Sequence, residues 1–166
     1  AEGDLERALA RLDELVARFP ASRYVPEAQF RRGEIHFSAQ RWRAAEEAYT
    51  AVIRAGERSG FLEQALYKHG WALFRQSDAE RSAASFLTLL DRMLVDPAAD
   101  QGARLPEALP RADRELVEDS FRALSIQFAD LESADTLAQS LSRHGGAPYA
   151  WMLYAALGDL LVQKER

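Results

Sequence analysis

A block of small and large apolar residues recurs along this chain at a fixed step of 37 positions. Ala8, Ala45 and Ser82 stand at this step. Four positions after each of them comes a large apolar residue, in turn Leu12, Tyr49 and Phe86. Upstream, the same step of 37 separates two glycines, Gly33 and Gly70. A repeat of this length is typical of one supersecondary unit that is used several times, so the chain is predicted to be built from copies of one unit.

The two glycines indicate what the unit is. Gly33 and Gly70 fall inside apolar-periodic segments, residues 28–39 and 65–76, which are predicted to be helices. A glycine inside a helix costs about 1 kcal/mol relative to alanine, so it is favoured where a second helix must come very close. Ala8 and Ala45 are the expected small partners on that second helix. Because one helical hairpin cannot bury both of its apolar faces, such hairpins are expected to stack.

These segments resemble tetratricopeptide repeats. That family has a glycine and a following aromatic residue in helix A, an alanine and an aromatic residue in helix B, and a closing proline. The matching residues are Phe30, Gly33, Phe37, Trp42, Ala45 and Tyr49 in one unit and Tyr67, Gly70, Phe74, Ser82 and Phe86 in the next. The period of 37 is longer than the family's usual one of about 34, and Gln40 and Ser77 replace the turn glycine.

The resemblance covers residues 3–95 and, more weakly, 148–166. It implies an all-α fold, a right-handed α-solenoid of helical hairpins with an irregular helical insertion. Gly3-Asp4 resembles the turn between helices A and B, so the sequence is expected to begin inside a repeat.

The joint at residues 19–28 carries a more particular resemblance. Its pattern is Pro20, Ser22, Tyr24, Glu27 and Ala28, and it resembles the joint between repeats of bacterial envelope proteins of this family. These include outer-membrane assembly lipoproteins and periplasmic Tol-associated cell-division factors. Pro20 is expected to end one helix. Pro26 suits the first turn of the next helix, where its missing N–H is not needed. A periplasmic or envelope-associated location is therefore expected, and a cytoplasmic one is the alternative.

One helical-repeat domain is expected over residues 1–166, with six segments. They are helix B of a partial repeat (1–20), two full repeats (21–57 and 58–95), a proline-rich linker (96–112), a helix pair without the repeat signature (113–147) and helix A of a further repeat (148–166). The eight helices are predicted at 5–18, 25–39, 41–55, 61–76, 78–94, 114–130, 133–143 and 148–164. Ser133 is the expected N-cap of the seventh helix, and Gly145-Gly146 its left-handed cap at the other end.

Composition excludes several classes of protein. The formal charge of −5 and the interspersed acidic and basic residues argue against a nucleic-acid partner. No run of about 18 apolar residues is present, so no membrane span is expected. The absence of cysteine removes disulfides and thiolate chemistry.

The sequence offers no catalytic or metal-binding pattern. Its three histidines, His36, His69 and His144, are far apart and lack metal-ligand spacing. Packing or groove lining is expected for the first two, and a helix C-terminal charge for the third. No nucleophile elbow or phosphate-binding loop is present either. We therefore expect no enzyme, no cofactor and no metal.

The resemblance places function on the concave face that helices A line in this family. The corresponding positions are Phe30, Arg31, Glu34, Phe37 and Ser38 in one repeat and Tyr67, Lys68, Trp71, Phe74 and Arg75 in the next. Of these, the two phenylalanines at 37 and 74 are more consistent with core packing. The family's lysine and asparagine clamp for a C-terminal carboxylate is absent. A protein or peptide partner is expected on this face.

The alternative is a structural spacer that associates with itself and holds no ligand in its groove. The first helix lacks its natural helix A and the last helix lacks its natural helix B, so apolar residues are expected to be exposed at both ends. The residues concerned are Leu5, Leu9, Leu12 and Val16 in the first helix and Trp151, Tyr154, Leu157, Leu160 and Leu161 in the last.

Overall fold

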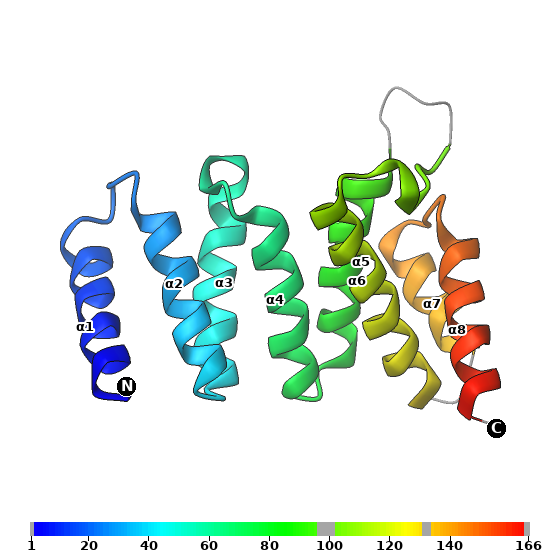
Figure 1. Ribbon diagram of the computed structural model, residues 1–166, viewed down its shortest axis with the longest axis horizontal. Coiled ribbons are helices and arrows are strands. Elements are labelled where there is room, and N and C mark those ends of the chain that lie inside the picture. The colour runs from blue at the N-terminus through cyan, green and yellow to red at the C-terminus, as the bar shows by residue number, and fades with distance from the viewer. Residues whose placement is uncertain (1, 96–101, 131–133, 165–166) are drawn as a thin grey trace. The chain divides into compact units, whose positions relative to one another are not determined.

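The structure is a computed structural model that describes residues 2–95, 102–130 and 134–164. All of its regular elements are helices, as expected for an all-α helical repeat (Figure 1). The described chain divides into two compact units, residues 1–78 and 79–166. This boundary falls inside the expected repeat 58–95, and the expectation of one domain over the whole chain stays a prediction.

The first unit contains four α-helices and one short 3-10 turn. They are α1 (Glu2–Arg18), α2 (Val25–Ser38), α3 (Trp42–Ala55), η1 (Gly56–Ser59) and α4 (Leu62–Arg75). Consecutive helices lie side by side, and both α2 and α4 pack on α3 (Figure 1). Each bound lies within three residues of the bound expected from the sequence.

The close crossing inside this unit lies between α2 and α3. A Cβ atom at Gly33 would come within 2.4 Å of the Tyr49 ring, so no larger residue fits without a shift. Tyr49 itself is fully buried, together with Ala45 and Val52. The core of the unit is completed by Phe30, Ala65 and Ala72, with Phe37, Ile53 and Phe61 packed against it. The small and aromatic residues that recur every 37 positions therefore lie at the close crossing of two helices, as predicted.

Two turns in this unit adopt the left-handed conformation without glycine. Gln40 has φ 57° and Ser77 has φ 61°. In the first turn, the N–H of Gln40 donates to the Phe37 carbonyl and the N–H of Arg41 donates to the His36 carbonyl. These two bonds are the pair that closes a helix with a left-handed residue. The backbone thus keeps the conformation that the family usually gives to glycine.

The joint between α1 and α2 is as the sequence predicts. Pro26 stands in the first turn of α2. The Tyr24 N–H donates to the Ser22 hydroxyl at 3.3 Å, and the Val25 N–H donates to the Ser22 carbonyl at 3.0 Å. Ser22 therefore shapes the approach to α2 while Pro26 begins its first turn.

The second unit contains four α-helices and a 3-10 turn. They are α5 (Ala79–Leu94), η2 (Pro106–Ala108), α6 (Arg111–Asp130), α7 (Ala134–His144) and α8 (Ala150–Lys164). Helix α6 packs on both α5 and α8. Its buried apolar stripe consists of Val117, Phe121, Leu124 and Phe128.

The start of α6 differs from the predicted one, whereas the end of α7 agrees with it. Helix α6 begins at Arg111, three residues earlier than predicted, and the Arg114 N–H donates to the Pro110 carbonyl at 2.9 Å. Helix α7 ends as predicted: Gly145 and Gly146 both have positive φ, and their N–H groups donate to the Ser142 and Leu141 carbonyls. The expected N-cap Ser133 and linker residues 96–101 lie outside the described residues.

Candidate functional site

Helices α2 and α4 carry all eight residues that the sequence analysis proposes for partner binding. Because these helices stand at the same place in two consecutive repeats, the step of 37 pairs Arg31 with Lys68 and Glu34 with Trp71. Seven of the eight side chains are at least partly exposed. We call these seven the helix-A face, and they are Arg31, Glu34, Ser38, Tyr67, Lys68, Trp71 and Arg75.

Phe30 is the exception. Its ring is only 8% exposed and stacks on Phe61 with a centroid distance of 4.9 Å. On its other side it contacts Tyr49 at 5.9 Å. Phe30 therefore belongs to the core, and it cannot offer its ring to a partner. The sequence does not reveal this burial because the covering ring, Phe61, lies 31 residues away (61 − 30).

An ion pair joins α2 to α4 on the helix-A face. The Lys68 Nζ lies 3.5 Å from Glu34 Oε1, and both side chains are about one-third exposed. The same carboxylate oxygen accepts a hydrogen bond from the buried Tyr49 hydroxyl at 2.5 Å. Burial, and then this hydrogen bond, raise the pKa of Tyr49 above its ordinary value. Glu34 thus connects a surface lysine to a core tyrosine.

A row of aromatic rings runs along α4. Tyr67 and Trp71 meet edge to face with a centroid distance of 6.4 Å, and Trp71 meets Phe74 in the same way at 5.4 Å. All three side chains are half-buried. Edge-to-face contacts of this kind stabilise and orient the rings. The rings on this helix are therefore held in place while part of each stays accessible.

Cations lie over the rings that border this row. Lys68 Nζ is 5.1 Å from the centroid of the Phe37 ring, and the Arg75 guanidinium is 5.5 Å from that of Trp42. The Phe37 and Trp42 rings also meet edge to face at 5.0 Å. Lys68 and Arg75 therefore cover apolar surface with a charged rim, in the manner of cation–π contacts.

The remaining two residues of the face are more exposed. Arg31 Nη2 lies 3.6 Å from Glu27 Oε1 in an exposed pair one helical turn apart, which contributes little to stability. The Ser38 hydroxyl donates to the Ile35 carbonyl at 3.0 Å. Neither side chain is held by a buried partner, so both can adapt to a ligand.

The three histidines lie in separate surroundings. His36 is half-buried, and burial, followed by the charges of Arg41 and Arg32, lowers its pKa. His69 Nε2 lies 3.1 Å from the Thr50 hydroxyl. Among the described residues, no three His, Asp or Glu side chains gather in a way that would hold a metal ion.

The third histidine belongs to a network that the sequence analysis did not find. His144 Nε2 lies 2.7 Å from Asp91 Oδ2, and the Tyr149 hydroxyl lies 2.6 Å from the other oxygen of the same carboxylate. Tyr149 is fully buried, and burial, then the bond to Asp91, raise its pKa. The network joins α5 to the end of α7 and to the residue that precedes α8. Asp91 lies more than 50 residues from both of its partners in the sequence, so no local pattern identifies the network.

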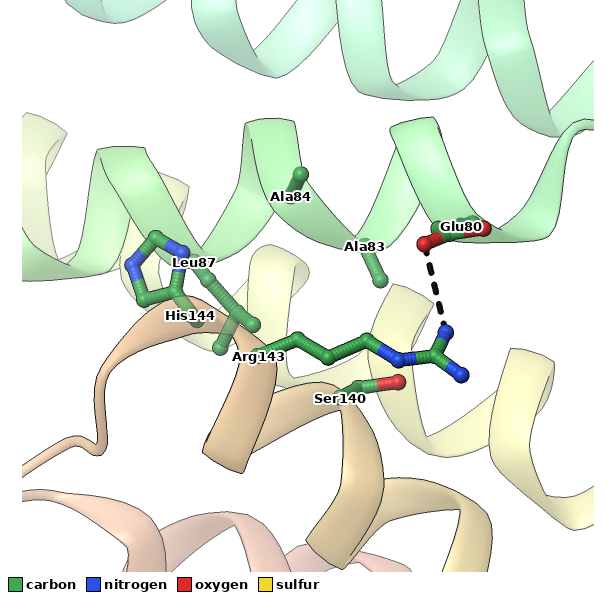
Figure 2. A pocket seen from close by; sticks show the side chains of 7 residues that line it. All are labelled: Glu80, Ala83, Ala84, Leu87, Ser140, Arg143 and His144. Carbon is green, nitrogen blue, oxygen red and sulfur yellow. Dashed lines mark hydrogen bonds and ion pairs between the residues drawn. The ribbon is translucent and has the colours of Figure 1, made fainter.

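A small pocket of about 210 Å³ lies between α5 and α7 (Figure 2). Its apolar wall includes Ala83 and Leu87, and Ser140 lies on the opposite helix. Figure 2 shows the Arg143 side chain running along the pocket toward Glu80, with an Nη1–Oε1 distance of 3.2 Å. Arg143 and Glu80 thus form an exposed ion pair at this pocket, which His144 also lines.

The packed helices and the glycine–aromatic crossing define a helical-repeat protein. A family model described as tetratricopeptide repeat matches residues 1–59 and 30–104, which together make up more than half of the chain. The chain therefore belongs to the tetratricopeptide repeat family, whose members are generally protein-interaction modules. No curated protein and no solved structure matches it. None of the described helices has both the length and the apolar character that crossing a membrane requires.

Proposed function

We propose that this protein binds a protein or peptide partner through the helix-A face. The observation that carries the proposal is the half-buried ring row of α4, with Tyr67 and Trp71 fixed edge to face and bordered by Lys68 and Arg75. Tyrosine, tryptophan and arginine are the residues that most often dominate binding energy at interfaces. Rings that are already held in place lose little conformational freedom when a partner binds, which favours affinity.

The charges of this face favour a partner with apolar or aromatic anchors over one led by a free carboxylate. Lys68 is paired with Glu34, so its charge is already largely neutralised within the molecule. Arg31 is paired with Glu27, and Arg75 lies over the Trp42 ring. A partner that presents apolar side chains to Tyr67 and Trp71 needs to break none of these contacts.

The proposal is tested by partner capture with a matched pair of variants. The immobilised protein is compared with the double variant Tyr67→Ala/Trp71→Ala and with Arg43→Ala/Glu47→Ala, which removes an exposed ion pair on α3. A partner that the chain and the α3 variant retain, and that the ring variant loses at least tenfold, supports binding at this face. Equal capture by all three proteins would contradict it. Circular dichroism and thermal unfolding check that the ring variant is folded.

The joint at residues 19–28 indicates in which part of the cell the partner should be sought. Its resemblance to envelope members of the family supports a location in the bacterial cell envelope, so an envelope extract is the first material to use. Fractionation of cells that produce the protein decides this part of the proposal. Recovery in the cytoplasmic fraction alone would contradict it.

A second candidate function is that of a self-associating spacer. The observation in its favour is the exposure of large apolar side chains in the last helix, where Trp151 is 60% exposed. The two functions are separable, because self-association is a property of the purified chain and partner binding requires a second protein.

A further inference from the structure

Another pocket, of about 410 Å³, lies between α6 and α8, and we call it the α6–α8 pocket. Its apolar wall includes Phe121 of α6 and Ala156 and Leu160 of α8. Phe121 is buried, whereas Ala156 and Leu160 are half-buried. Ligand pockets have volumes of about 300–1,000 Å³ and mostly apolar walls with a few polar groups. The size and the wall of the α6–α8 pocket are therefore those of a binding site.

Helix α8 packs on α6 beside this pocket. Leu157 is buried there, so the expectation that it is exposed is wrong. The same correction applies to Leu9 of α1, which lies on the side of its helix where Asp13 pairs with Arg32 of α2. The side of α8 that lines the pocket carries Asp159 instead, and this carboxylate is exposed.

Ser125 of α6 lines the pocket with an unsatisfied polar group. The residue is 4% exposed, and its hydroxyl is buried without a hydrogen-bond partner among the described residues. Ser120 on the same helix is fully buried as well, but its hydroxyl donates to the Leu116 carbonyl at 2.7 Å. A buried hydroxyl without a partner costs stability. The Ser125 hydroxyl therefore favours a ligand that can form a hydrogen bond with it.

The helical register directs Ser125 toward the pocket. It follows Glu118 by seven residues and Phe121 by four, and these intervals bring side chains to one face of a helix. Helices α6 and α8 run in the same direction (Figure 1). Glu118 therefore lines the end of the pocket where both helices begin, and Ser125 lines the other end together with the exposed Gln163 of α8.

Two carboxylates give the pocket a negative charge. Glu118 of α6 and Asp159 of α8 both line it, and neither forms an ion pair with another described residue. The basic Arg122 lines it too, but its Nη1 lies 3.0 Å from Asp119 Oδ1, so its charge is balanced on its own helix. Charge complementarity therefore favours a cation in this pocket.

We propose that the α6–α8 pocket binds a lysine side chain of a partner protein. The ammonium group lies between Glu118 and Asp159, and the aliphatic chain lies against the apolar wall. The Ser125 hydroxyl and the Gln163 amide then form hydrogen bonds with the peptide groups beside the lysine. A small alkylamine has no such groups, so the two polar residues favour a protein segment. The proposal concerns the second unit and is independent of the helix-A face.

A capped pentapeptide with one lysine between alanines tests the proposal. It is titrated into the isotope-labelled chain, and the amide resonances of α6 and α8 are followed by nuclear magnetic resonance. The same peptide with an Nε-acetylated lysine removes the charge, and n-pentylamine removes the peptide groups. The lysine peptide is expected to shift these resonances, with an affinity about tenfold higher than that of the acetylated peptide and about threefold higher than that of n-pentylamine.

Two charge variants identify the site. Glu118→Gln and Asp159→Asn each remove one charge at an exposed position with little change in shape, so both are expected to fold. Each should weaken binding of the lysine peptide about threefold, and the double variant about tenfold. Asp135→Asn removes the same charge from an exposed position on α7 and is the matched control, with unchanged binding. Added salt should weaken binding by the chain and by this control.

A serine variant separates binding from a structural role. Ser125→Ala should weaken binding of the lysine peptide about threefold, leave that of n-pentylamine unchanged and leave the thermal unfolding midpoint undiminished, since no hydrogen bond is lost. Ser120→Ala is the matched control. It loses the bond to Leu116, so its midpoint should fall while its affinity for the peptide stays the same.

Four results would overturn the proposal. The first is that the lysine peptide at millimolar concentration shifts no resonance of α6 or α8. The second is equal binding of the acetylated peptide, which would show an apolar groove without charge selection. The third is that n-pentylamine binds as tightly as the peptide, which would indicate a site for small amines. The fourth is a midpoint of Ser125→Ala that falls as far as that of Ser120→Ala. None of these results bears on the helix-A face, which the capture experiment with Tyr67 and Trp71 tests separately.

Discussion

At the scale of the residue, the contact between Gly33 and Tyr49 determines how closely α2 and α3 approach. The Tyr49 ring is fully buried, and its hydroxyl is bonded to Glu34. The ring therefore cannot withdraw without giving up both packing and a hydrogen bond. The backbone at position 33 is ordinary helix, so glycine is not needed there for its conformational freedom. It is needed because the Tyr49 ring leaves no space for a side chain.

This argument predicts opposite effects of one substitution at two positions. Gly33→Ala places a Cβ atom 2.4 Å from the Tyr49 ring and should lower the free energy of unfolding by about 1–3 kcal/mol, the usual cost of overpacking. Gly158→Ala meets open space and should raise it by up to about 1 kcal/mol through helix propensity. Urea unfolding at low protein concentration measures both. A neutral or stabilising Gly33→Ala would refute the close contact.

At the scale of the element, helices follow from local pattern and their ends from turn chemistry. The step of 37 and the apolar spacing place all eight helices within three residues of their observed bounds. The Gly145-Gly146 cap is confirmed as well. The early start of α6 was missed because Arg111, Ala112 and Asp113 carry no apolar stripe, although Asp113 suits the first turn of a helix.

The turns at Gln40 and Ser77 give a prediction at this scale. Both residues hold a positive φ, which costs a residue with a side chain about 1 kcal/mol. Gln40→Gly and Ser77→Gly should each raise the free energy of unfolding by about 0.5 kcal/mol, since the gain exceeds the extra entropy of glycine in the unfolded chain. Ala39→Gly, one residue earlier and at φ −83°, should instead lower it. Thermal unfolding of the three variants measures these changes. Equal effects at positions 39 and 40 would contradict the view that the positive φ of Gln40 is strained.

At the scale of the whole molecule, burial is distributed unevenly along the repeat. Helix α3 has Ala45, Ala48, Tyr49 and Val52 buried between α2 and α4. In α1, Leu9 alone is buried among the described side chains. Local stability follows the amount of buried apolar contact. Helix α1 is therefore expected to be less protected than α3.

Hydrogen exchange should show this gradient. In dilute protein, the amides of α1 should exchange at least tenfold faster than those of α3. Exchange followed by mass spectrometry measures this difference. Uniform protection of α1 and α3 in dilute protein would contradict the gradient.

The sequence by itself determined the repeat, its family, the helices and the small-residue crossing, because each of these depends on local spacing that recurs every 37 residues. It also placed eight candidate residues on helices α2 and α4, of which the structure leaves seven accessible. Only the tertiary structure decided that Phe30 is covered by Phe61, that Glu34 joins Lys68 to Tyr49, and that Asp91 binds both His144 and Tyr149. These depend on which side chains distant in the sequence meet in space, and periodicity gives the direction of a side chain but does not give its neighbour.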